Sequence, residues 1–156
     1  KVLDKKEKEI YTRDCGMKID LLNLNWIYRA KKYYHMLPPD IYLMTIPIHY
    51  RIKVDEFKAL VEAPTVDQFM QLLANTYYEN RFHAMQRSEG MEQFYKACIH
   101  GMYLSDRRRN PYSLATVNTY LFLKEEEINR LTTALECIRY GLTPRETLGY
   151  IGGAKK

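Results

Sequence analysis

The stretch that decides the fold is NPYSLATVNTYLFLKEEEINRLTTALECIRYG, residues 110–141. Alternating steps of three and four from Leu114 meet an apolar residue at every position but one. This spacing is typical of one face of a long helix, so we expect the stripe to pack against another helix. The stripe consists of Leu114, Val117, Leu121, Lys124, Ile128, Leu131, Leu135 and Ile138.

Lys124 interrupts the stripe with a charge, and Glu125, Glu126 and Glu127 follow it directly. An unpaired ammonium is costly to bury, so a lysine on a packed face either extends to water or meets a carboxylate. Glu127 is within reach on the same helix, and Asp20 is the long-range candidate if two helices pack. Our hypothesis is that Lys124 forms such a pair and fixes the alignment of the helix. Simple exposure at the helix edge is the alternative.

Capping residues, glycines and prolines divide the rest of the chain into further helices. Asn110 as N-cap with Pro111 at the first position opens the long helix, which ends at Tyr140 before Gly141. The other predicted helices are Val2–Arg13, stopping near Gly16; Ile19–Tyr34; a short turn over Pro39–Met44; Asp55–Glu62; Val66–Asn75, started by a capping box of Thr65 and Gln68; Gly90–Arg109; and a short last helix capped by Thr143, Pro144 and Glu146.

The segment IPIHYRIKV, residues 46–54, alternates apolar and polar residues with the period of a strand. The sequence offers no second strand for it to pair with, and a lone strand is not stable. We therefore interpret this segment as an extended connector. The predicted fold class is all-α, with packed antiparallel helices, and residues 1–156 are expected to form a single helical region.

The composition fits one globular core: 156 residues, 46% hydrophobic and 28% charged. The net charge of +5 is compatible with nucleic acid, anionic lipid or an acidic protein as partner, and equally with a solvated surface. Cys15, Cys98 and Cys137 lie far apart without a C-x-x-C motif, which indicates buried thiols in a reducing compartment. The longest apolar run is far shorter than the roughly 20 residues of a membrane span, so we expect a soluble chain.

The residues that carry chemistry in other proteins form no catalytic or cofactor pattern here. The histidines are too dispersed for two ligands on one helix face, and neither a phosphate-binding loop nor a dinucleotide fingerprint occurs. Glu125, Glu126 and Glu127 point about 100° apart on a helix and are expected to form a solvated face. The cluster Arg107, Arg108 and Arg109 is either compensation of a helix end or a partner contact. We predict no catalytic, cofactor-binding or metal-binding residue.

Two helical segments resemble motifs of a known family. DLLNLNWIYRAKKYY, residues 20–34, resembles the D-x-x-N-[IL]-x-x-[IL]-x-R-x-K helix of the C subunit of V-type and A-type rotary ATPases, called subunit d in vacuolar ATPases. YLFLKEEEINRL, residues 120–131, is similar to the family's Y-x-x-x-K-E-x-E-[IV] helix. Between them, residues 57–79 follow the family's order of a leucine-rich turn, a small capped helix and an aromatic end. The matching residues are Asp20, Asn23, Leu24, Ile27, Arg29, Lys31, Tyr120, Lys124, Glu125, Glu127 and Ile128.

One departure from the family pattern lies in the connector. Many members have a glycine shortly after the proline of the IP step, where this chain has Ile48, His49 and Tyr50. The departure affects the expected local turn. The chain also begins with Lys1 in place of a methionine, and full members of the family are longer. We therefore expect residues 1–156 to be a fragment of a longer chain.

The resemblance implies both a shape and a role. The shape is a funnel of helices, built from three related helical units around a pseudo-threefold axis, to which this chain contributes a part. The role is that of a non-catalytic rotor subunit that couples the central stalk to the membrane ring of ion-carrying subunits, peripheral to the membrane on its cytoplasmic face. Arg107, Arg108 and Arg109 are the candidate partner contacts. The alternative is a helical nucleic-acid-binding protein that uses the basic excess and the helix pair 90–140.

Overall fold

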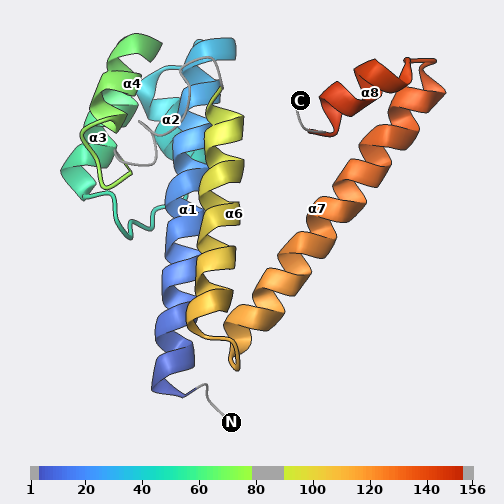
Figure 1. Ribbon diagram of the computed structural model, residues 1–156. Coiled ribbons are helices and arrows are strands. Elements are labelled where there is room, and N and C mark those ends of the chain that lie inside the picture. Colours follow the sequence, from blue (N-terminus) through green and yellow to red (C-terminus); the bar gives the residue numbers. More distant parts are fainter. Residues whose placement is uncertain (1–3, 79–89, 153–156) are drawn as a thin grey trace.

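The computed structural model describes residues 4–78 and 90–152, and the regular structure in those ranges is entirely helical (Figure 1). This confirms the predicted all-α class. The helices are α1 (Lys5–Tyr33), α2 (Pro38–Met44), α3 (Val54–Glu62), α4 (Val66–Leu73), α6 (Met91–Arg109), α7 (Leu114–Arg139) and α8 (Pro144–Tyr150).

Two long helices, α1 and α6, form the spine of the molecule. They lie side by side and run in opposite directions, and α2, α3 and α4 pack together around one end of α1 (Figure 1). At the other end the chain turns sharply from α6 into α7, which leans away from the spine, and α8 folds back beside the far end of α7. The predicted antiparallel packing is thus present in the spine, whereas α7 shares only its first turns with it.

The hydrophobic core follows one face of α1. Ile10, Met17, Leu21, Leu24 and Tyr28 recur at steps of three, four or seven and are all buried. The opposing core residues come from α2, α3, α4 and α6: Ile41, Phe57, Leu60, Val61, Phe69, Leu73, Met91, Phe94, Cys98, Ile99 and Met102. The side chains predicted on one face of the helix over 90–109 therefore meet α1, as expected from their period.

Gly16 does not end a helix, contrary to prediction. Helix α1 is continuous from Lys5 to Tyr33 and includes the residues assigned to two helices; the predicted start at Val2 lies outside the described residues. The glycine serves a close approach instead, because a Cβ added to Gly16 would collide with the Tyr50 side chain. A glycine inside a helix costs some stability, yet here it makes room for an aromatic ring from the connector.

The start of α7 also differs from prediction. Ser113, and not Asn110, is the N-cap: its hydroxyl accepts a hydrogen bond from the Ala115 N–H and donates one to the Asn110 carbonyl at 2.8 Å. Asn110 instead caps the end of α6, through its N–H to the Asp106 carbonyl. The helix therefore begins at Leu114, three residues beyond Pro111.

Three other helix ends match their capping signals. Gly141 follows the C-cap of α7 with a φ of +73°, and Thr143 and Glu146 form the capping box that opens α8. Thr65 accepts a hydrogen bond from the Gln68 N–H at the start of α4, which ends at Leu73, two residues before the predicted Asn75. Residues 46–53 are neither helix nor strand, which confirms the interpretation of this segment as a connector, except that its last residue, Val54, begins α3.

The apolar stripe of α7 is exposed, so the expectation that it packs against another helix of this chain is wrong. From Val117 to Ile138 its apolar members are 52–66% exposed. The buried residues of α7 are Ala115, Thr119 and Cys137, which lie on the other side of the helix. Helix formation was predicted correctly, but the face that packs on α6 and α8 is the less apolar one.

None of the helices within residues 4–78 and 90–152 is both long and apolar enough to cross a membrane.

Candidate functional site

Asp20 fixes the connector to the spine. Its buried carboxylate accepts hydrogen bonds from the backbone N–H groups of Tyr50, Arg51 and Ile52, at 3.0, 2.6 and 3.3 Å. The Tyr78 hydroxyl donates a further bond to it at 3.2 Å. A buried carboxylate needs several donors to replace water, and these four provide them. Burial, together with the neighbouring Asp20, raises the pKa of Tyr78 far above its usual value, which keeps its hydroxyl a donor.

Asn23 holds the same connector one turn further along α1. Its amide nitrogen donates to the Ile46 carbonyl and its amide oxygen accepts from the Ile46 N–H, both at 2.9 Å. The side chain thus satisfies both polar groups of one backbone residue, as a neighbouring strand would. Together, Asp20 and Asn23 explain why a segment with strand-like alternation lies ordered without a strand partner.

Lys31 and Arg29 attach α1 to other helices. The Lys31 ammonium donates to the carbonyls of Val61 and Ala63, both at 2.6 Å, and so caps the end of α3. Partial burial lowers the pKa of Lys31. Arg29 lies 3.5 Å from Glu92 in the first turn of α6, an exposed ion pair that contributes little energy. The four polar motif residues on α1, which are Asp20, Asn23, Arg29 and Lys31, therefore all contact neighbouring segments.

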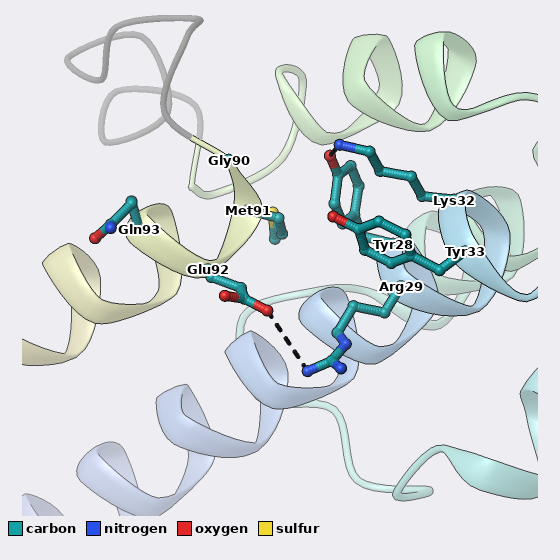
Figure 2. Close-up of a pocket in the computed structure, with 8 residues that line it drawn as sticks. All are labelled: Tyr28, Arg29, Lys32, Tyr33, Gly90, Met91, Glu92 and Gln93. Carbon is teal, nitrogen blue, oxygen red and sulfur yellow. Dashed lines mark hydrogen bonds and ion pairs between the residues drawn. The ribbon is translucent and has the colours of Figure 1, made fainter. Parts of the chain in front are cut away.

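A small cavity of about 150 Å³ lies between the end of α1 and the start of α6 (Figure 2). The Lys32 ammonium donates to the Tyr28 hydroxyl at 2.7 Å and lies over the rings of Tyr28 and Tyr33. This bond raises the pKa of Lys32. Arg29 and Glu92 face each other across the opening, as the dashed line in Figure 2 shows. Arg29 thus contacts Glu92 and Lys32 contacts Tyr28, so the described polar groups around the cavity link side chains that belong to α1 and α6.

The motif residues on α7 lie on its surface. Lys124 contacts Glu127 at 2.7 Å, with both side chains about half exposed, so the predicted local pair is present but not buried. The proposed long-range pair with Asp20 is absent, because the Asp20 carboxylate is occupied by the connector and Tyr78. Tyr120 and Glu125 are exposed as well. The registration hypothesis for Lys124 is therefore wrong within this chain, and its ammonium remains in contact with water.

Arg107, Arg108 and Arg109 are exposed in the last turn of α6, beside the turn into α7. Cations at this position complement the negative end of the helix dipole. Their exposure also leaves the guanidinium groups accessible to an acidic partner. The structure thus places them beside the start of α7, at the end of the spine that lies away from α2, α3 and α4 (Figure 1).

A buried charged cluster, which the sequence analysis missed, lies at the junction of α1 and α6. Arg13 Nη2 lies 2.6 Å from Asp106 Oδ1, and Arg13 Nε lies 3.6 Å from Asp14 Oδ1. Both carboxyl groups are buried. Burial, with the neighbouring Asp106 carboxyl, raises the pKa of Asp14 to about 7, against the lowering effect of Arg13. One feature of the sequence could have indicated this cluster: Asp14 is a charged residue within an apolar stripe, between Ile10 and Met17.

No group of three or more histidine, cysteine or acidic residues within the described ranges is arranged to hold a metal ion. The ring centroids of His49 and Phe57 lie 4.5 Å apart, and those of His100 and Phe122 lie 6.2 Å apart, so each histidine has an aromatic neighbour. His83 lies outside the described residues. Cys98 and Cys137 are buried, as predicted, and Cys15 is half-buried.

Comparison with known proteins gives one family. The family model described as ATP synthase (C/AC39) subunit matches residues 1–150. Neither a curated protein nor a solved structure matched the chain.

Proposed function

The chain belongs to the ATP synthase (C/AC39) subunit family, and from that premise we propose that it is a non-catalytic rotor subunit that couples the central stalk to the membrane ring of a rotary ATPase. The observation that carries this proposal is the family match over residues 1–150. Membership supports a place in a V-type or A-type ATPase complex. The coupling role, the absence of catalysis and the identity of the neighbours are our proposal.

The architecture supports a mechanical role. A coupling subunit must transmit torque without deforming, and helices packed along their length resist bending better than loops. The spine of α1 and α6 has this property, because buried residues of both helices belong to one hydrophobic core. Asp20, Asn23 and Lys31 add polar links from α1 to the connector and α3, so the smaller helices move with the spine.

We assign the partner contacts to surfaces that the fold leaves open. Arg107, Arg108 and Arg109 form an exposed basic cluster, suited to an acidic surface of the stalk or the ring. Tyr120, Lys124, Glu125 and Glu127 lie on the exposed part of α7, and we place them at a protein contact. In this proposal the chain is bound peripherally, on the cytoplasmic face of the membrane, through protein contacts alone.

The proposal is tested by purifying the tagged chain from its source cell and identifying the bound proteins. We expect stalk and ring subunits of a rotary ATPase among them. A complex that lacks the chain is expected to hydrolyse ATP while losing ATP-driven ion transport into vesicles, because the coupling element is absent. Ion transport that persists without the chain would contradict the coupling role.

The arginine cluster can be tested separately with the triple variant R107E/R108E/R109E. Binding to the stalk or ring should weaken, while the circular dichroism of the helices stays unchanged. A matched control reverses Lys5, Lys6 and Lys8, three exposed cations in the first turn of α1. If both variants bind equally well, the arginines serve only the helix end.

The alternative of nucleic-acid binding makes a different prediction. A protein that neutralises several phosphates loses affinity steeply as salt increases. Binding of duplex DNA with such a slope, combined with failure to join stalk subunits, would replace the coupling proposal.

A further inference from the structure

The junction of α1, α6 and the start of α7 contains more buried negative charge than its one cation balances. Asp14 and Asp106 are both buried, and Arg13 is the guanidinium that contacts them. With both carboxyl groups ionised the cluster has a net charge of −1, and both of these carboxyl groups are buried while Arg13 is 27% exposed. Such an imbalance is expensive, and two neighbouring carboxylates usually relieve it by taking up a proton.

The unsatisfied polar atoms of the cluster also favour a bound proton. Among the described residues, both oxygens of Asp14 and Oδ2 of Asp106 accept no hydrogen bond of good geometry, and Nε and Nη2 of Arg13 donate none. A buried acceptor without a donor costs free energy. Arg13 cannot satisfy every oxygen of two carboxylates, whereas a proton on either carboxyl group adds an O–H that can donate to the other. A single proton thereby reduces both the excess charge and the number of unsatisfied oxygens.

We propose that Asp14 and Asp106 share one proton, and that this buried proton site makes the packing of the last turn of α6 against α1 dependent on pH. A metal ion fits less well, because Arg13 already occupies the cationic position between the carboxyl groups. The proposal concerns a site that the coupling role does not use, and it stands independently of that role.

The titratable and charged groups around Asp14 are few. Arg13 comes from α1 itself, and α6 contributes Asp106 and Tyr103. Burial, with Asp14 as the next contribution, raises the pKa of Tyr103 to about 12, so this side chain stays neutral across the range of interest. From α7, Glu125 acts on Tyr103 and not on Asp14, while the residues of α7 buried at the junction, Ala115 and Thr119, carry no charge.

The position of the cluster gives the proton a structural consequence. Asp106 lies in the last turn of α6, and its backbone carbonyl accepts the Asn110 N–H that closes this helix. Helix α7 begins only a few residues later, and its Thr119 hydroxyl donates to the Tyr103 carbonyl at 2.8 Å. Loosening of the last turn of α6 would therefore alter the point from which α7 leaves the spine.

The sign of the pH dependence follows from the direction of the shift. The pKa of Asp14 in the folded chain, about 7, lies above that of an unfolded aspartate, so the folded chain binds the proton more tightly. Its contribution to stability is fully present below the unfolded pKa and is lost as the pH rises through about 7. The equilibrium constant for unfolding is then expected to rise about tenfold between roughly pH 6 and pH 8 from this site.

The experiment compares chemical denaturation of the chain 1–156 with that of D14N over this pH range. The asparagine amide can donate permanently to Asp106, so D14N should lose the tenfold change and remain as stable at high pH as at low pH. The matched control D40N removes an exposed carboxylate of α2 and should keep the wild-type profile. Parallel pH profiles for the wild type and D14N would overturn the proposal.

A second measurement does not depend on a variant. The side-chain carboxyl resonances of Asp14 and Asp106 can be followed in the wild-type chain by carbon NMR during a pH titration. We expect the Asp14 carboxyl group to release its proton near neutral pH. If both carboxyl groups titrate with the ordinary pKa of an exposed aspartate, the shared proton does not exist.

Discussion

Helices α1 and α7 have the same sequence pattern and opposite environments. Each has an apolar stripe at steps of three and four with a charged residue within it, Asp14 in α1 and Lys124 in α7. The stripe of α1 is buried and its aspartate with it, whereas the stripe of α7 is exposed and its lysine reaches water. The spacing of apolar residues therefore identifies which residues share a helix face, but not whether another helix packs against that face.

The difference arises from neighbours. Helix α1 is contacted along its length by α2, α4, α6 and α7, whereas α7 meets the spine at its first turns and α8 near its end. The middle of α7 has solvent on the side of its apolar stripe. Contiguous exposed apolar residues often mark protein contacts, in agreement with the proposed role within a larger assembly.

The largest expected effect comes from truncating the same residue type on each stripe. Leu24→Ala on α1 should lower the free energy of unfolding by about 2–5 kcal/mol, because it leaves a cavity in the core. Leu135→Ala on α7 should change it by no more than about 0.5 kcal/mol, because that side chain is exposed. Urea denaturation of the two variants measures both. Equal losses would mean that the stripe of α7 is covered in solution.

The next comparison replaces the carboxylate that anchors the connector. Asp20→Asn removes a charged acceptor shared by backbone N–H groups and the Tyr78 hydroxyl, and should cost about 1.5–3 kcal/mol. The change should also speed hydrogen exchange of the amides of Tyr50 and Arg51. Asp40→Asn, at an exposed position, is the control and should leave both measurements unchanged. Unaltered exchange in D20N would show that the connector is held by other contacts.

Two glycines inside helices should respond with opposite signs. Gly16→Ala should destabilise the chain by about 1–3 kcal/mol, because the new Cβ would collide with the Tyr50 ring. Gly101→Ala should stabilise α6 by about 0.5–1 kcal/mol, because a Cβ there meets open space and alanine favours helix. Thermal denaturation followed by circular dichroism shows whether each variant is more or less stable than the wild type. A gain in stability from G16A would contradict the close approach of Tyr50.

The smallest effect is expected at Lys124. Because its pair with Glu127 is exposed, Lys124→Met should leave the denaturation midpoint of the isolated chain almost unchanged. Glu127→Gln breaks the same pair from the other side and should behave alike. A large loss in K124M alone would restore a buried role for the lysine. Weaker binding to stalk or ring subunits without any loss of stability would place Lys124 at a partner contact.

Local signals predicted the elements better than their boundaries. The capping box of Thr143 and Glu146 and the left-handed Gly141 marked helix ends correctly, because caps are determined by neighbouring residues. Gly16 was misread as a stop, since its reason lies in Tyr50, which is distant in sequence. Asn110 was misread as an N-cap, since Ser113 competes for the same function from three residues away.

The candidate site was predicted only in part for the same reason. The motif residues on α1 were identified by resemblance, but their partners in the connector and α3 became known from the structure. Asp14 and Asp106 were not predicted as site residues, although Asp14, like Lys124, is a charged residue within an apolar stripe. Nothing local distinguishes the two positions, because burial of a charge depends on which helix packs over it.

The amino-acid sequence by itself determined that this chain is helical, the approximate extent of most helices, and to which family it belongs. These properties depend on the period of apolar residues, on caps within a few positions, and on motifs read in order. Only the tertiary structure decided that α1 is one helix, that the stripe of α7 is exposed, and that two aspartates meet around Arg13. Contacts between residues far apart in sequence determine burial, and burial sets the charge state and the cost of every polar group.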